Sequence, residues 1–155
     1  MRTTATRARD LGAPRLALTV QSTVDSSALP RRPTLRRWAL AALERDARVT
    51  LRFVGAREGR ALNHRYRGRD YATNVLTFVY DEGVSLAGDI VLCAPVVAKE
   101  AHAQHKRLVA HYAHLVIHGM LHLQGYDHER DADAARMEAR EADVLQGLRY
   151  ANPYA

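Results

Sequence analysis

The sequence predicts a single α+β domain, in which a four-stranded mixed β-sheet packs against about five helices. The chain of 155 residues is long enough for one domain with its own core, and 47% of its residues are hydrophobic. Short segments with strand periodicity are interleaved with longer segments of helical periodicity, an order that favours this fold class. No internal repeat or linker divides the chain. We therefore predict one domain over residues 15–155, preceded by a flexible polar extension over residues 1–14.

Four segments are predicted to be strands, because apolar and polar residues alternate in them or β-branched residues gather there. These strands cover residues 16–21, 49–54, 74–80 and 89–93, and a turn around residues 81–83 joins the last two. Five segments are predicted to be helices. They cover residues 34–46, 57–67, 95–105, 108–124 and 131–148. Thr34 is expected to cap the first helix, Gly68 to close the second, and Pro95 to lie in the first turn of the third.

The fourth predicted helix carries His118 and His122, and Gly125 and His128 follow it. Histidines four positions apart stack on one face of a helix, about 6 Å apart along its axis. Gly125 stands where a left-handed turn ends a helix, and this reversal would bring His128 back toward the other two rings. Three converging imidazoles are typical of a zinc site with an open position for water. We therefore predict one zinc ion per chain, on this central helix and its return loop.

Gly119 distinguishes this pattern from the zinc peptidases with the same histidine spacing, which carry a glutamate as general base directly after the first histidine. Glycine inside a helix costs about 1 kcal/mol relative to alanine, so its presence suggests that another segment approaches the backbone closely. A zinc metallopeptidase remains an alternative, with Asp127 or Glu129 in place of the missing base.

Other polar residues near the histidines have more than one interpretation. Asp127 either orients an imidazole from behind or caps the loop. His111 and His114 are interpreted as core or cleft residues rather than ligands, although His114 is a candidate for a supporting contact with the site.

The composition restricts the partners of the protein. Its formal charge is +6, and all but two of its 23 Lys and Arg residues are arginines, which bind phosphate oxygens in pairs. This charge favours a polyanionic partner, although a GC-rich genome would also enrich arginine.

The single cysteine, Cys93, excludes a disulfide or a cysteine zinc site within one chain. There is no apolar run of about 18 residues and no secretory signal core, so we expect a soluble cytoplasmic protein without a membrane partner.

Several blocks of the sequence together resemble one protein family. They are Leu62-Asn63, Tyr66-Arg67-Gly68-Arg69-Asp70, Thr73-Asn74-Val75-Leu76-Thr77-Phe78, Gly88-Asp89-Ile90-Val91, Ala110-His111-Tyr112-Ala113-His114, the segment from His118 to His128, and Met137, Glu138 and Asn152-Pro153-Tyr154. The family is that of the YbeY-type endoribonucleases, which mature bacterial ribosomal RNA. The resemblance extends over residues 16–154. Arg69 and Thr77 depart from the usual lysine and serine, but they keep the charge and the hydroxyl group.

The resemblance implies a zinc site at the three histidines and a functionally important arginine at Arg67. The alternative interpretation of Arg67 is a favourable interaction of its charge with the C-terminus of its helix. It further implies an endoribonuclease specific for single-stranded RNA, acting at the 3′ end of small-subunit ribosomal RNA and in ribosome quality control. Its partner would be the ribosome or the small-subunit precursor. We expect further arginines to hold phosphates, namely Arg60, Arg65 and Arg69. A ribosome-assembly factor with structural zinc is the non-enzymatic alternative.

Overall fold

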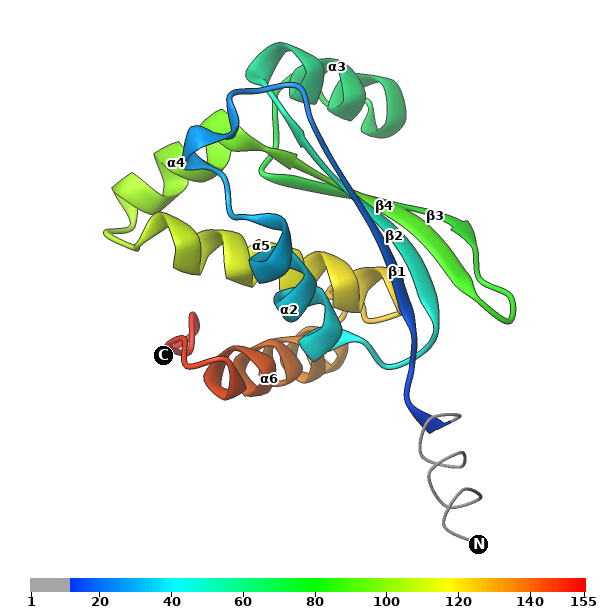
Figure 1. The fold of residues 1–155 in the computed structure, drawn as a ribbon. Coiled ribbons are helices and arrows are strands. Elements are labelled where there is room, and N and C mark those ends of the chain that lie inside the picture. Colours follow the sequence, from blue (N-terminus) through cyan, green and yellow to red (C-terminus); the bar gives the residue numbers. More distant parts are fainter. Residues whose placement is uncertain (1–11) are drawn as a thin grey trace, which may run out of the picture.

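The computed structural model describes residues 12–155, which form a four-stranded sheet and five α-helices (Figure 1). The strands are β1 (Leu16–Ser22), β2 (Ala47–Val54), β3 (Val75–Asp81) and β4 (Leu86–Cys93). The helices are α2 (Arg32–Ala42), α3 (Ala56–Arg67), α4 (Ala94–Ala103), α5 (Leu108–Leu123) and α6 (Asp131–Gly147), with a short 3-10 helix at Ser26–Ala28. The predicted α+β class is confirmed. The extension predicted for residues 1–14 lies outside the described residues except at its last three positions.

The sheet is mixed, as predicted, with the strand order β1-β2-β4-β3. The first three of these strands are parallel, and β3 runs antiparallel to β4 at one edge. Side chains on β4 alternate between two cores. Ile90 and Leu92 belong to the main core, whereas Val91 and Cys93 belong to a smaller cluster with Leu62 of α3. The sheet therefore carries α5 on one face and α3 on the other.

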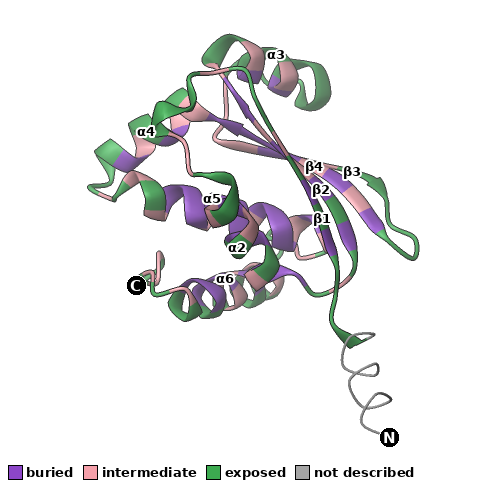
Figure 2. Ribbon diagram, in the orientation of Figure 1, coloured by how far each residue is buried: buried purple, intermediate pink, exposed green. Residues whose placement is uncertain are grey.

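Helix α5 is the centre of the molecule. It lies between the sheet and α6, and it also contacts α2 and α4 (Figure 1). Ten of its 16 residues are buried, and Figure 2 shows buried segments along most of its length. A helix that is apolar on nearly every side is stable only inside a core. This position explains why the histidines that it carries are held rigidly. None of the described helices is long and apolar enough to cross a membrane.

Several element boundaries differ from the prediction by two to four residues, and two of the differences have a clear cause. The helix predicted over residues 34–46 covers Arg32–Ala42, and it starts early because Pro33 fits the first helical turn, where its missing N–H costs nothing. The strand predicted from Asp89 starts at Leu86 and includes Gly88, a residue that normally weakens a strand. A Cβ at Gly88 would lie 2.7 Å from the carbonyl oxygen of Phe78, so the close approach of β3 requires glycine.

Gly119 is the point of closest approach between α5 and β4. A Cβ there would lie 2.9, 3.0 and 3.2 Å from three side-chain atoms of the fully buried Ile90, which confirms the close approach inferred from the sequence. We expect Gly119→Ala to lower the free energy of unfolding by up to about 2 kcal/mol, because the overpacking cost of about 1–3 kcal/mol outweighs the helix-propensity gain of about 1 kcal/mol. Urea denaturation measures this loss.

The matched control is Gly147→Ala, at the end of α6, where an added Cβ meets nothing within 4 Å. This variant should be at least as stable as the wild type. Equal stability of Gly119→Ala and the wild type would contradict the tight contact between α5 and β4.

Candidate active site

Three imidazoles converge at the C-terminal half of α5. His118 and His122 project from one face of the helix with parallel rings, 6.3 Å apart between centroids. His128, from the loop after the helix, lies 5.5 Å from the first ring and 5.7 Å from the second. The structure therefore brings together the three residues that the sequence predicts as ligands.

The return loop that carries His128 is built by the end of α5. Gly125 has a φ of +103°, the left-handed conformation that the sequence predicts for it. The N–H of Tyr126 then bonds back to the carbonyl oxygen of Leu121 at 3.1 Å, which closes the turn. Gln124 ties the loop to the chain after α2, since its side chain donates to Ala42 O and accepts from the backbone N–H of Glu44. These bonds fix the direction in which the chain leaves the helix.

Hydrogen bonds leave the Nε2 atoms of the two helical histidines free. Nδ1 of His122 donates to the carbonyl oxygen of Tyr126 at 3.1 Å, and Nδ1 of His118 lies 3.4 Å from a carboxylate oxygen of Glu141. Because both partners are acceptors, the proton is assigned to Nδ1, and Nε2 keeps its lone pair. Burial and the neighbouring His118 lower the pKa of His122, which favours the neutral form that binds metals.

The spacing of the rings tests whether a metal ion fits between them. With Zn–N bonds of about 2.1 Å and tetrahedral angles, the centroids of two ligating rings lie about 5.3 Å apart. The observed separations of 5.5, 5.7 and 6.3 Å exceed this distance slightly. Within residues 12–155, no group of three or more His, Cys, Asp or Glu side chains is already arranged to hold an ion. Three imidazole nitrogens are donors that zinc prefers, and to hold an ion the rings would have to turn and to close by about 1 Å or less.

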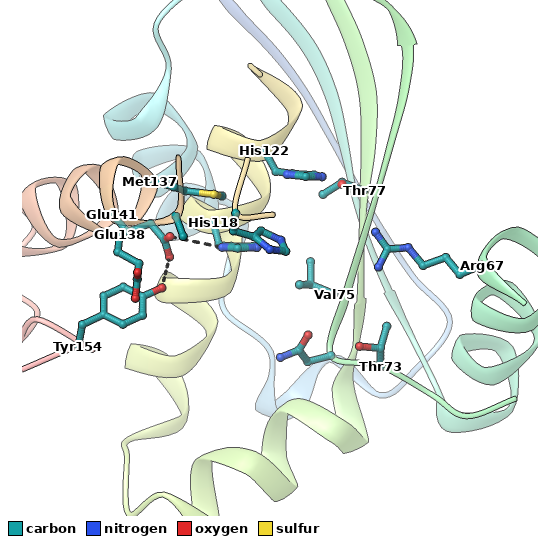
Figure 3. A pocket seen from close by; sticks show the side chains of 13 residues that line it. Arg67, Thr73, Val75, Thr77, His118, His122, Met137, Glu138, Glu141 and Tyr154 are labelled. Carbon is teal, nitrogen blue, oxygen red and sulfur yellow. Dashed lines mark hydrogen bonds and ion pairs between the residues drawn. The ribbon is translucent and has the colours of Figure 1, made fainter. Parts of the chain in front are cut away.

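Arg67 lines the same cavity as the three histidines. It is the last residue of α3, and Gly68 ends that helix with a φ of +69°. Asn63 fixes the following loop, since its side-chain amide donates to the carbonyl oxygen of Tyr71 at 2.7 Å. In the described part of the chain, the Arg67 guanidinium makes no hydrogen bond or ion pair, and Figure 3 shows it pointing across β3 toward the imidazoles.

The cavity has a volume of about 470 Å³ and lies beside β3, the edge strand of the sheet. Residues from both faces of the sheet and from α6 line it. They are Arg67, Thr73, Asn74, Val75, Thr77, His118, His122, His128, Ala134, Met137, Glu138, Glu141 and Tyr154. One wall thus carries the arginine and the threonine hydroxyls, and the other carries the imidazoles and two carboxylates. This arrangement suits a charged, polar ligand held between the guanidinium and the imidazoles.

Glu141 of α6 is a buried carboxylate that holds the site together, with only 1% of its surface exposed. Its oxygens lie 2.7 Å from Nε2 of His114, 2.9 Å from the Tyr154 hydroxyl and 3.4 Å from Nδ1 of His118 (Figure 3). Burial alone would raise the pKa of Glu141, but the hydrogen bonds with His114 and His118 outweigh burial and hold the pKa at about 2. The carboxylate is therefore ionised and accepts all three bonds.

The sequence interpretation missed Glu141, although a signal was present. In α6 the buried residues Met137, Glu141 and Leu145 recur every fourth position, so a carboxylate occupies the apolar stripe of the helix. A charged residue in such a stripe is rarely left without partners. Asn74 was also missed as a cavity residue. It is fixed by Glu100, which accepts from its side-chain amide at 3.0 Å.

The other residues near the histidines make structural contacts, which the sequence alone did not decide. Asp127 caps the return loop, since its carboxylate accepts from the backbone N–H of His128 at 2.7 Å and of Glu129 at 3.3 Å. In the described residues it makes no hydrogen bond to an imidazole. His114 supports the site through Glu141, and the buried His111 pairs with Glu100 at 2.9 Å. Neither His111 nor His114 lines the cavity.

The three arginines predicted to hold phosphates do not line the cavity either. The guanidinium of Arg60 is already occupied by a two-bond ion pair with Asp70, at 2.8 and 2.9 Å. Arg65 lies over the ring of Tyr66, and Arg69 contacts the hydroxyl of Tyr71. Neighbouring residues at the end of a helix point in different directions, so these arginines lie outside the cavity although they are close to Arg67 in the sequence. Phosphate binding by Arg60, Arg65 and Arg69 stays a prediction.

The close contact at Gly119 also weighs against the peptidase alternative. A glutamate at this position would have to pass the side chain of Ile90, which an added Cβ alone already approaches to 2.9 Å. Of the two substitutes considered from the sequence, Asp127 is already engaged in capping the return loop.

The fold and the cavity define a class of single-domain α+β proteins whose site combines imidazoles on a central helix with an arginine from the opposite face of the sheet. The family model described as "Endoribonuclease YbeY" matches residues 31–149 of the chain. The chain belongs to the YbeY endoribonuclease family, as the sequence resemblance predicted. Enzymes of this name are endoribonucleases, which are hydrolases that act on phosphodiester bonds.

Relatives named "Endoribonuclease YbeY" match most of the chain. The relative from Aromatoleum aromaticum is 62% identical over 144 residues, which cover 91% of this chain and 94% of the relative. The relative from Azoarcus sp. is 59% identical over 92% of this chain and 61% of its own length. Among solved structures, the solution structure of TM1509 from Thermotoga maritima is similar, with a TM-score of 0.56 and 26% identity over 85% of this chain and 91% of that one.

Proposed function

We propose that the protein is a zinc-dependent endoribonuclease that cuts single-stranded RNA. The observation that supports this proposal best is that Arg67 and the three histidines, from opposite faces of the sheet, line one cavity. A cation across from a metal site suits a phosphodiester, whose reaction builds negative charge on the phosphoryl oxygens. His118, His122 and His128 would hold the ion through their ring nitrogens. When bound, the zinc ion supplies Lewis-acid charge to the phosphate and to water in the cavity.

Three residues of the cavity can then be assigned roles on this proposal. Arg67 binds the phosphoryl oxygens and stabilises the charge that develops on them. Glu141 keeps the proton on Nδ1 of His118, so that the opposite ring nitrogen faces the cavity. Asn74 presents a side chain fixed by Glu100. Single-stranded RNA suits this site, because its backbone can enter between the two walls of the cavity. The backbone of double-stranded RNA is held in the RNA duplex.

We further propose ribosomal RNA as the substrate, with the 3′ end of the small-subunit RNA as the site of action. The support is membership of the family and the net charge of +6, which favours a polyanionic partner. On this proposal the protein works in the cytoplasm on the ribosome or on its small-subunit precursor, and contributes to ribosome quality control.

The experiment for this proposal measures zinc per chain and the cleavage of matched single-stranded and double-stranded RNA. We expect one zinc per chain, cleavage of the single strand alone, loss of cleavage with a chelator and recovery with added zinc. A small-subunit precursor should be cut near the 3′ end of its mature sequence. Cleavage that continues at the same rate in metal-free protein would refute the zinc dependence.

Glu141→Gln should weaken zinc binding about 10- to 100-fold, the usual cost of losing a partner that orients a ligand. The amide cannot accept from His114, Tyr154 and His118 at once, so the proton on His118 is no longer fixed to Nδ1. Competition with a chromophoric chelator measures the affinity without any RNA. Asp143→Asn, at an exposed position of the same helix, is the control and should bind zinc as the wild type does.

A further inference from the structure

A second cavity, of about 380 Å³, lies between the N-terminus of α5 and the chain that follows α6. Three basic side chains line it, those of Lys106, Arg107 and Arg149, and no aspartate or glutamate side chain does. We call it the basic cavity. None of these three side chains forms an ion pair with a carboxylate in the part of the chain that the structure describes. Among the described residues, the side chains that line the basic cavity therefore include three basic groups and no acidic one.

The N-terminus of α5 adds hydrogen-bond donors to the basic cavity. The first turn of α5 contains no acidic residue, and its N-cap residue, Arg107, provides no side-chain acceptor for the free N–H groups there. Ala110 of that first turn also lines the cavity. Free N–H groups at a helix N-terminus attract anions, and phosphate groups in particular. Helix α5 thus adds its positive end to the charge of the three side chains.

One layer of side chains separates the basic cavity from the active site. His114 lines the basic cavity, and its Nε2 lies 2.7 Å from Glu141 and 3.1 Å from the Tyr154 hydroxyl, both of which line the active-site cavity. Asn152 and Pro153 line the basic cavity, while the adjacent Tyr154 lines the other. A strand that leaves the active site on this side passes directly over the basic cavity.

The backbone conformation of Arg149 offers a way to test the basic cavity. Helices α3 and α5 both end in a left-handed residue that is glycine, Gly68 and Gly125. Helix α6 ends in the same motif, with the N–H of Tyr150 bonded to Leu145 O at 2.8 Å, but its left-handed residue is Arg149, with a φ of +69°. A side chain in this conformation costs about 1 kcal/mol or more, a cost that glycine avoids.

We propose that the basic cavity is a second phosphate-binding subsite, in which Lys106, Arg107 and Arg149 hold a phosphodiester of the RNA strand whose neighbouring segment occupies the active site. This inference rests on the proposed function, because it takes the ligand to be the RNA substrate. The subsite binds the backbone and reads no base, since its donors are charged side chains and helix N–H groups. It would position the strand and increase affinity rather than take part in bond cleavage.

The test uses Arg149→Gly, because relief of backbone strain should not lower the stability of this variant, whereas loss of the guanidinium should weaken its binding of RNA. Relief of the left-handed strain should leave the melting temperature equal or higher, while loss of the charge should weaken the binding of a strand of about 12 nucleotides about three- to tenfold. The slope of log affinity against log salt should fall in magnitude by about 0.7, the value for one phosphate contact on a single strand. Fluorescence anisotropy with RNA that carries hydroxyl groups at both ends restricts the contact to internal phosphodiesters.

His105→Gly is the matched control. His105 is the left-handed residue at the end of α4, with a φ of +55°, and it does not line the basic cavity. This variant should be equally or more stable and should bind RNA with unchanged affinity. Arg149→Lys should restore most of the salt dependence that Arg149→Gly loses. An Arg149→Gly protein that binds the long strand as tightly as the wild type, with the same salt slope, would overturn the subsite.

The length of the RNA separates this proposal from the function on which it rests. A strand of about three nucleotides fills only the active site, so the wild type and Arg149→Gly should bind and cut it equally. An equal loss of affinity for short and long strands would place Arg149 at the active site and refute a separate subsite. If the wild type cuts no RNA, the proposed function fails, and the salt slope for the long strand still tests the subsite.

Discussion

His118→Ala should abolish zinc binding at the site and reduce RNA cleavage by at least about 10³-fold, because the Lewis-acid charge of a metal ion contributes several kcal/mol to such reactions. The centroid of the His118 ring lies 6.3 Å from that of His122 and 5.5 Å from that of His128, and without it only two of the three proposed ligands remain. Metal per chain, measured by mass spectrometry, and the cleavage rate of single-stranded RNA should fall together.

The fold should survive this substitution. Glu141 keeps its bonds to His114 and Tyr154, and α5 is held by a core to which His118 does not belong. The melting temperature of His118→Ala should therefore match that of metal-free wild type. Unfolding of both metal-free proteins would favour the alternative of a structural zinc ion in an assembly factor. His102→Ala, at an exposed position of α4, is the control and should keep both metal and activity.

Arg67→Ala should lower kcat by about 10² to 10³-fold while zinc content stays at the wild-type level. The guanidinium reaches the cavity from α3 and contacts none of the three imidazoles through a hydrogen bond in the described residues, so its removal leaves the ligands in place (Figure 3). Arg67→Lys should recover only part of the rate, because an ammonium group cannot bind two phosphoryl oxygens in a fixed plane. Single-turnover cleavage measures the chemical step directly.

Arg57→Ala provides the matched control for Arg67→Ala. Arg57 is an exposed arginine in the first turn of the same helix and lies away from the cavity, so its loss removes the same charge without touching the site. If the two variants lose the same small amount of activity, Arg67 acts only through net charge. A loss of zinc from Arg67→Ala would also contradict the assignment, since it would show that the arginine supports the ligands rather than the substrate.

Local sequence patterns were sufficient to predict the secondary-structure elements and the three histidines. The spacing of His118 and His122 fixes their position on one helical face, and a glycine two residues after the end of that helix reverses the chain toward His128. These relations involve contacts within about ten residues, so they depend little on the rest of the fold. Errors at boundaries arose where a non-local contact overrode local preference, as at Gly88, whose place in β4 depends on the approach of β3.

Only the tertiary structure decided which distant residues join the histidines. The family resemblance singled out Arg67, but no local spacing shows which arginine reaches the histidines. The packing of α3 against β4 places Arg67 in the cavity wall and leaves Arg60 and Arg69 outside it. Glu141 lies 23 positions from His118 and reaches it because α6 packs on α5. The sequence by itself thus determined the metal-binding pattern, because helical spacing is local. Which distant side chains join the histidines depends on how the helices pack on the two faces of the sheet, and no local spacing specifies that packing.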